Sequence, residues 1–143
     1  MNEQEFKDRT KQFGLRVVML LNDHPRSYVT DTLGRQLLRS ATSVGANYRA
    51  ACRARSVADV IAKLAIVEEE TDEARYWLEV FGEAGAAPQA VLDPLIAEAD
   101  EILAMVVASI KTLRKRQHAG DGGFRSSSGV FQSKIQNPKS KIT

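Results

Sequence analysis

The sequence of 143 residues is poor in the residue types that form covalent cross-links and metal centres. Cys52 is the only cysteine, so no intrachain disulfide can form, which suits a reducing compartment. The two histidines, His24 and His118, do not follow a carboxylate at the Glu-x-x-His spacing that di-iron bundle proteins use. These absences exclude a disulfide framework and a di-iron centre, and we expect no metal and no cofactor.

Long apolar runs and alternating patterns are also missing. No apolar stretch approaches the about 20 residues that cross a bilayer, and the polar start MNEQEFKDRT lacks the apolar segment of a signal peptide. No segment alternates between apolar and polar residues as a half-buried strand does. Hydrophobic residues make up 43% and charged residues 27%, the balance of a globular protein. We expect a soluble, cytoplasmic, all-α protein with no membrane partner.

Apolar residues instead recur at steps of three and four over most of the chain, which is typical of amphipathic helices. We expect helices over residues 3–22, 30–54 or 32–54, 57–83 and 94–116. Ser56 and Asp93 are expected N-caps, with Pro94 in the first turn after Asp93. Because short connections make successive helices antiparallel, the sequence predicts an up-down-up-down four-helix bundle over residues 1–116.

Residues 117–143 differ from the rest of the chain because glycine and serine replace the apolar repeat. We expect a low-complexity, disordered tail there. Pro138 argues against a coiled coil built on the repeated SKI near its end. Four Lys and Arg residues against Asp121 give this tail a net charge of +3. The tail is either a tolerated extension or a weak additional attraction for a polyanion.

Charge is segregated along the chain, although the formal net charge is only +2. Residues 35–63 contain six basic residues and one acid, whereas residues 68–83 contain seven acids and one base. The candidates for contacts to nucleic-acid phosphates are Arg49, Arg53, Arg55 and Lys63. A solvated helix end, favoured by the helix dipole, explains the three arginines equally well.

The stretch RSATSVGANYRAACRAR (39–55) combines small residues and cations on one expected helix. Gly45 indicates close packing, since a glycine inside a helix otherwise costs about 1 kcal/mol relative to alanine. Arg39 is expected to pair with Glu73 on the antiparallel third helix, and Glu68 lies on an apolar line where it needs a partner. We group six residues as a structural polar core: Arg39, Ser40, Ser43, Asn47, Glu68 and Glu73.

Two weaker signals point towards catalysis. Glu69, Glu70 and Glu73 match E-E-x-x-E, and Glu98 with Glu101 supplies E-x-x-E on the next helix, spacings that suit Mg²⁺. This arrangement resembles the all-α nucleoside triphosphate pyrophosphohydrolases, although their second motif ends in aspartate; a solvated acidic face explains it as well.

Cys52 is the only candidate nucleophile of thiol type. Its neighbours Arg49 and Arg53 could lower the pKa of the thiol. A small apolar thiol packed in a helix interface is the more common case, and no helical histidine lies near it in sequence to serve as a base.

RSATSVGANYRAACRARS, followed by KLAIVEEETDEARYWLE, resembles the four-helix-bundle proteins called 23S rRNA-intervening-sequence proteins (ribosomal protein S23-like). The shared motifs are R-S-x-x-S-[IV]-x-x-N-Y and E-x-x-x-W-L. They match Arg39, Ser40, Ser43, Val44, Asn47 and Tyr48, then Glu73, Trp77 and Leu78. The family usually has Glu three residues after the motif asparagine, where this chain has Ala50. The resemblance covers about residues 6–116.

The resemblance implies a homopentameric ring or barrel. Related accessory proteins of diversity-generating retroelements bind nucleic acid and a reverse transcriptase, and no enzymatic activity is established for the family. We therefore expect a non-enzymatic, homopentameric protein that binds RNA or DNA through its basic surface. The alternatives are a protein-interaction scaffold, such as a reverse-transcriptase accessory subunit, and a Mg²⁺-dependent pyrophosphohydrolase.

Overall fold

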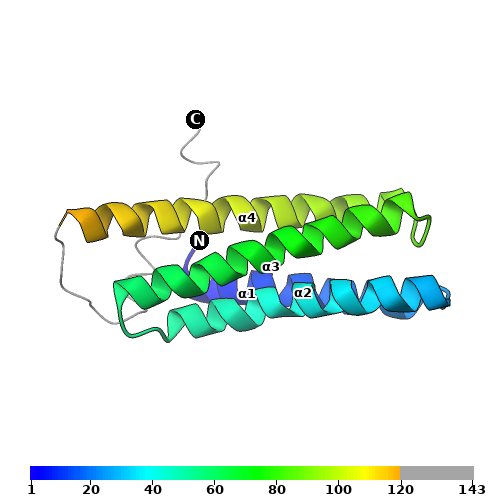
Figure 1. Cartoon of the computed structure of the whole chain (residues 1–143), viewed down its shortest axis with the longest axis horizontal. Coiled ribbons are helices and arrows are strands. Elements are labelled where there is room, and N and C mark those ends of the chain that lie inside the picture. The colour runs from blue at the N-terminus through cyan, green and yellow to red at the C-terminus, as the bar shows by residue number, and fades with distance from the viewer. Residues whose placement is uncertain (120–143) are drawn as a thin grey trace.

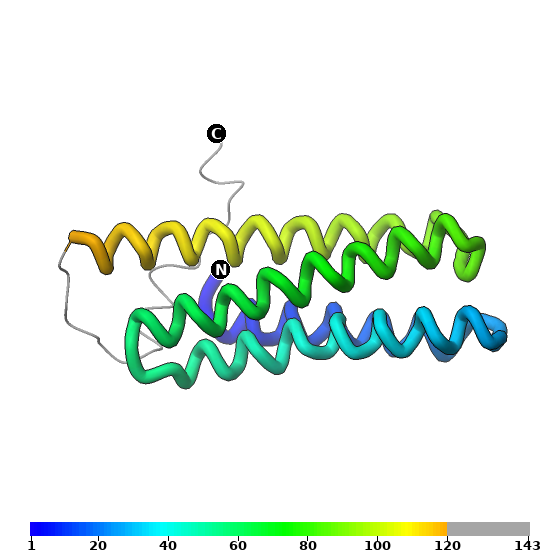
Figure 2. The backbone as a smooth tube through the Cα atoms, viewed as in Figure 1, coloured from blue at the N-terminus to red at the C-terminus, as the bar shows by residue number. Residues whose placement is uncertain are grey.

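The computed structural model describes residues 1–119 and consists of helices joined by short connections (Figure 1). The helices are α1 (Glu3–Asp23), α2 (Tyr28–Cys52), α3 (Val57–Glu83) and α4 (Gln89–His118). The backbone reverses direction at each connection, so neighbouring helices run antiparallel (Figure 2). The all-α, up-down-up-down prediction is confirmed for this part of the chain. Residues 120–143, which hold most of the tail that we expected to be disordered, lie outside the described residues.

The start of α2 differs from the prediction, which placed it at Thr30 or Thr32. The helix begins at Tyr28 because Ser27 is the N-cap. The Ser27 side chain accepts from the Thr30 N–H at 3.1 Å, and the Ser27 N–H donates to the Thr30 hydroxyl at 2.8 Å. Thr30 thus takes the third position of a capping box, a place more often held by Glu or Gln.

The start of α4 also differs, because Asp93 is not its N-cap. The helix begins at Gln89, directly after Pro88, and Pro94 lies inside it. The first turn, which precedes the predicted start, places Leu92 in the core, where it is fully buried. Pro94 has no N–H to donate in the second turn, and the packing of the preceding turn offsets that loss. At its other end α4 runs two residues beyond the predicted Arg116.

The core lies along the bundle axis, and the backbones of α1 and α2 approach each other closely at Gly45. A Cβ atom at Gly45 would lie 3.3 Å from the backbone nitrogen of Lys11 and from the carbonyl carbon of Thr10. Near the same end, the rings of Phe6 and Tyr48 meet edge to face with centroids 4.7 Å apart. Helices α2 and α3 make the most extensive contact, whereas α1 and α4 contact each other sparsely. The α1/α4 seam is therefore the least extensive of the four helix contacts in the bundle.

Candidate nucleic-acid interface

The four predicted phosphate-binding residues lie at the end of the bundle where α2 turns into α3 (Figure 1). Arg49 is in the last turn of α2, Arg53 is the C-cap, Arg55 is in the connection and Lys63 is in α3. The three arginines are exposed and the lysine is partly buried. None of the four side chains makes an ion pair or hydrogen bond within residues 1–119.

These cations surround the end of the bundle and do not form one flat patch. Arg49 lines a groove between α1 and α2 together with Lys7 and Lys11. Lys63 precedes Glu70 by seven residues, so both lie on the side of α3 that faces α2. A ligand that contacts both Arg49 and Lys63 must therefore cross the end of the bundle.

The last turns of α4 bring further cations to the same end of the bundle, as Figures 1 and 2 show. Lys111, Arg114 and Lys115 line a groove between α3 and α4, with His118 at the end of the helix. These α4 cations are not among the four predicted phosphate-binding residues. Their position could have been predicted from the sequence, because an antiparallel bundle places the end of its fourth helix beside the turn between the second and third helices.

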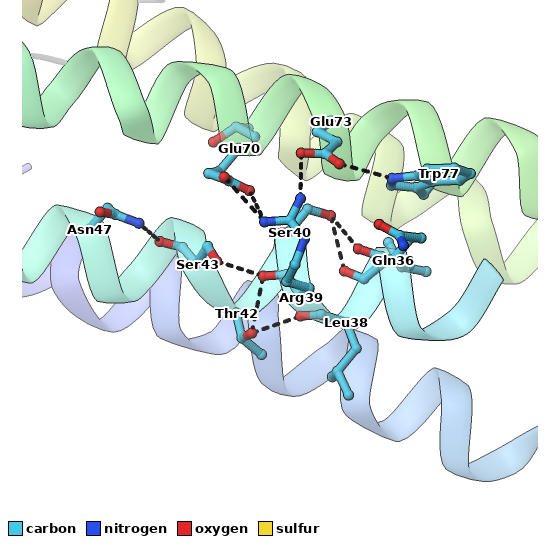
Figure 3. A network of polar contacts seen from close by, with 12 residues as sticks. Gln36, Leu38, Arg39, Ser40, Thr42, Ser43, Asn47, Glu70, Glu73 and Trp77 are labelled. Atoms are coloured by element: carbon cyan, nitrogen blue, oxygen red, sulfur yellow. Dashed lines mark hydrogen bonds and ion pairs between the residues drawn. The ribbon is translucent and has the colours of Figure 1, made fainter. Parts of the chain in front are cut away.

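The ion pair expected between Arg39 and Glu73 is present, and Glu70 joins it (Figure 3). Arg39 Nη2 lies 2.6 Å from Glu73 Oε2, and Nη1 lies 3.3 Å from both Glu70 oxygens. The Trp77 indole also donates to Glu73 at 3.3 Å. The Arg39 side chain is 50% exposed, so this is a surface ion pair and not part of a buried core.

The Arg39 guanidinium lowers the pKa of the Glu73 carboxyl through its hydrogen bond. The pair therefore contributes to stability above the ordinary carboxyl pKa, and the contribution is lost as the pH falls through the lowered value. Water and salt screen an exposed pair, so this contribution is small.

Ser40, Ser43, Asn47 and Glu68, the other members of the expected polar core, make no hydrogen bond or ion pair to another helix within residues 1–119. Ser40 is buried and donates to the Gln36 and Leu37 carbonyls at 3.1 Å, within its own helix. Ser43 donates to Arg39 O, and Asn47 donates to Ser43 O (Figure 3). Glu68 is only partly buried, lies in the α3/α4 groove, and has no hydrogen-bond or ion-pair partner within residues 1–119. The partner that we expected for it is absent from this part of the chain.

The carboxylates of the two acidic motifs are directed to different guanidinium groups. Glu70 and Glu73 bind Arg39 on the α2/α3 seam. Glu98 and Glu101 bind Arg9 on the α1/α4 seam, with Arg9 Nη2 2.6 Å from Glu98 and 2.5 Å from Glu101. Among the described residues no group of three or more His, Cys, Asp and Glu side chains is placed to hold a metal ion. The motifs therefore do not converge on one magnesium site.

Cys52 is buried beside Tyr48, and its two arginine neighbours do not lower its pKa. Burial, followed by the charge of the Glu3 carboxylate, raises the pKa of the Cys52 thiol to about 12. The thiol stays protonated at neutral pH, when only the thiolate is nucleophilic.

We therefore expect Cys52 not to react with Ellman's reagent in the native protein at pH 8 over several minutes. The same protein in guanidinium chloride should release one equivalent of the coloured thiolate per chain, because the sequence holds one cysteine. Stoichiometric labelling of the native protein at the rate of a free thiol would contradict the buried placement.

Within residues 1–119, no helix is long and apolar enough to cross a membrane. A family model described as 23S rRNA-intervening sequence protein matches residues 2–108. A crystal structure from Bacteroides thetaiotaomicron, described as a protein of unknown function from the S23 ribosomal protein family, shares 33% sequence identity with this chain. The match has a TM-score of 0.67 and covers 74% of this chain and 98% of that one. No curated protein matches significantly. The chain belongs to the 23S rRNA-intervening sequence protein family.

Proposed function

We propose that this protein is a non-enzymatic, homo-oligomeric, nucleic-acid-associated protein that binds the phosphate backbone through Arg49, Arg53, Arg55 and Lys63. One observation carries the proposal: these four cations have no carboxylate partner in residues 1–119, whereas Arg9, Arg26, Arg39 and Arg75 each have one. Cations without a carboxylate partner are available to phosphates, and contacts of this kind do not depend on the base sequence.

The proposal includes self-association into a pentameric ring and a cytoplasmic location. A ring repeats the basic end of each subunit, so a modest charge per chain produces a strong local field. The unpaired Cys52 is in keeping with a reducing compartment.

Fluorescence anisotropy with labelled RNA and DNA over a range of salt concentrations tests the proposal. We expect the variant Arg49→Ala/Arg53→Ala/Arg55→Ala to bind at least about tenfold more weakly at low salt, with a further loss when Lys63→Ala is added. Each lost phosphate contact should reduce the slope of log K against log salt by about 0.7 to 0.9.

The matched control removes three exposed arginines elsewhere on the bundle: Arg16→Ala/Arg26→Ala/Arg35→Ala. It has the same net charge as the test variant, so a purely global charge effect would weaken both equally. Binding and salt slope that are identical in the two variants and the wild type would overturn the assignment.

A protein-interaction scaffold is the second candidate function, favoured by exposed apolar residues on the α1/α2 face. Leu15, Met19 and Leu38 are all exposed there, Met19 by 63%. A polymerase such as a reverse transcriptase is the kind of partner proposed. Recovery of such a partner, together with no shift of RNA or DNA by the wild-type protein, would favour this candidate over the first.

A further inference from the structure

The groove between α3 and α4 at the basic end of the bundle has features that the proposed phosphate contacts do not use. Its volume is about 460 Å³. Val107 and Ile110 form its apolar part, and Glu68 is the only lining residue from α3. The remaining lining residues are Lys111, Arg114, Lys115 and His118. Val107 is exposed, so the groove offers apolar surface beside three cations.

Glu68 is unusual among the glutamates at the helix seams. Glu70, Glu73, Glu79 and Glu98 each contact an arginine, but Glu68 makes no hydrogen bond or ion pair within residues 1–119. A partly buried carboxylate has lost part of its hydration, and its oxygens can still accept hydrogen bonds from a ligand. The groove is therefore suited to a ligand that brings N–H donors to Glu68 and negative charge to the three cations.

Single-stranded nucleic acid carries both N–H donors and negative charge, and its bases and phosphates lie close together. Its phosphates attract Lys and Arg, and its unpaired bases expose their Watson–Crick edges and stack on aromatic rings or on the planes of arginine side chains. A carboxylate repels phosphate but accepts hydrogen bonds from base N–H groups. Guanine offers the best match because its N1–H and N2–H lie side by side and can engage both carboxylate oxygens. An acidic peptide would satisfy the cations and leave Glu68 facing like charge.

We propose that the α3/α4 groove binds a segment of single-stranded nucleic acid, with Lys111, Arg114 and Lys115 contacting phosphates and Glu68 accepting hydrogen bonds from guanine. This assignment rests on the proposed function, because it specifies the strand type and the base that the basic end prefers. It also extends the interface from the α2–α3 turn to the neighbouring end of α4 (Figure 1).

Three labelled 12-mers test the base preference by anisotropy: all uridine, uridine with three guanosines, and the same strand with inosine in place of guanosine. Inosine lacks only the N2 amine. We expect the wild-type protein to bind the guanosine strand about fivefold more tightly than the other two. Glu68→Gln should abolish that preference without weakening binding to the uridine strand, since it removes a negative charge from the groove.

Glu69→Gln, which changes the adjacent exposed glutamate, is the matched control and should keep the preference. Lys111→Ala/Arg114→Ala/Lys115→Ala should weaken all three strands and reduce the salt slope. Thermal denaturation by circular dichroism checks that each variant is folded.

The outcomes separate the two proposals. Absence of nucleic-acid binding by the wild-type protein would overturn both. The groove assignment alone would be overturned if binding depends on Arg49, Arg53 and Arg55 but the guanosine strand is not preferred. It would also be overturned if a guanosine preference exists and Glu68→Gln does not remove it. Equal competition by duplex DNA would also overturn the groove assignment. So would displacement of the strand by polyglutamate of the same total charge, if this displacement disappears when the three α4 cations are substituted.

Discussion

Substitution of Gly45 by valine is expected to lower the free energy of unfolding by about 3 kcal/mol. Even a Cβ atom at this position would lie 3.3 Å from the α1 backbone at Thr10 and Lys11, and valine adds two methyl groups beyond it. The neighbouring atoms belong to a helix backbone, which cannot rotate away as a long side chain can. The two helices must separate, and the close packing of the core near Tyr48 is lost with them.

The measurement is urea denaturation followed by circular dichroism at a fixed protein concentration, since self-association would otherwise shift the midpoint. Ala46→Val is the matched control, because it places the same β-branched side chain at the next, exposed position of α2. It should change the free energy of unfolding by no more than about 0.5 kcal/mol. Equal midpoints for the two variants would show that the α1–α2 contact tolerates a side chain.

Replacing Arg9 by methionine is expected to cost about 2 kcal/mol. Arg9 donates from Nε and Nη2 to Glu98 at 2.9 and 2.6 Å, and it also reaches Glu101. Methionine keeps most of the apolar stem but leaves the Glu98 carboxylate, whose side chain is only 15% exposed, without its donor. The loss is large for an ion pair because the desolvated carboxylate remains behind.

Arg26→Met provides the comparison for Arg9→Met. Arg26 also forms a two-contact pair, with Asp31 at 3.2 Å, but its side chain is 84% exposed. Its removal should cost less than about 0.5 kcal/mol. The same denaturation experiment applies, and a loss for Arg9→Met as small as that for Arg26→Met would mean that Glu98 is well hydrated without its partner.

The helices were predictable from the sequence because their apolar repeats are long and uninterrupted. The starts of α2 and α4 were not, for two different physical reasons. Ser27 caps α2 with a threonine at the third position, a weaker signal than the usual Glu or Gln. Asp93–Pro94 has the form of a helix start, but burial of Leu92 extends α4 upstream of it, so tertiary packing overrides the local signal.

The polar contacts were predictable only between helices that follow each other in the chain. Arg39 and Glu73 could be paired because α2 and α3 are antiparallel neighbours. Arg9 and Glu98 are 89 residues apart, and nothing local marks them as partners. Ser40 and Ser43 were predicted to belong to a structural polar core, and each hydroxyl bonds to a carbonyl of the preceding turn, as a serine inside a helix readily does.

The sparse contact between α1 and α4 means that the bundle does not resist opening equally on all sides. Local opening has fewer contacts to break at this seam, which the Arg9–Glu98 ion pair spans, than at the other three. We therefore expect local opening to separate α1 from α4 before it separates α1 from α2, whose backbone approaches α1 closely at Gly45.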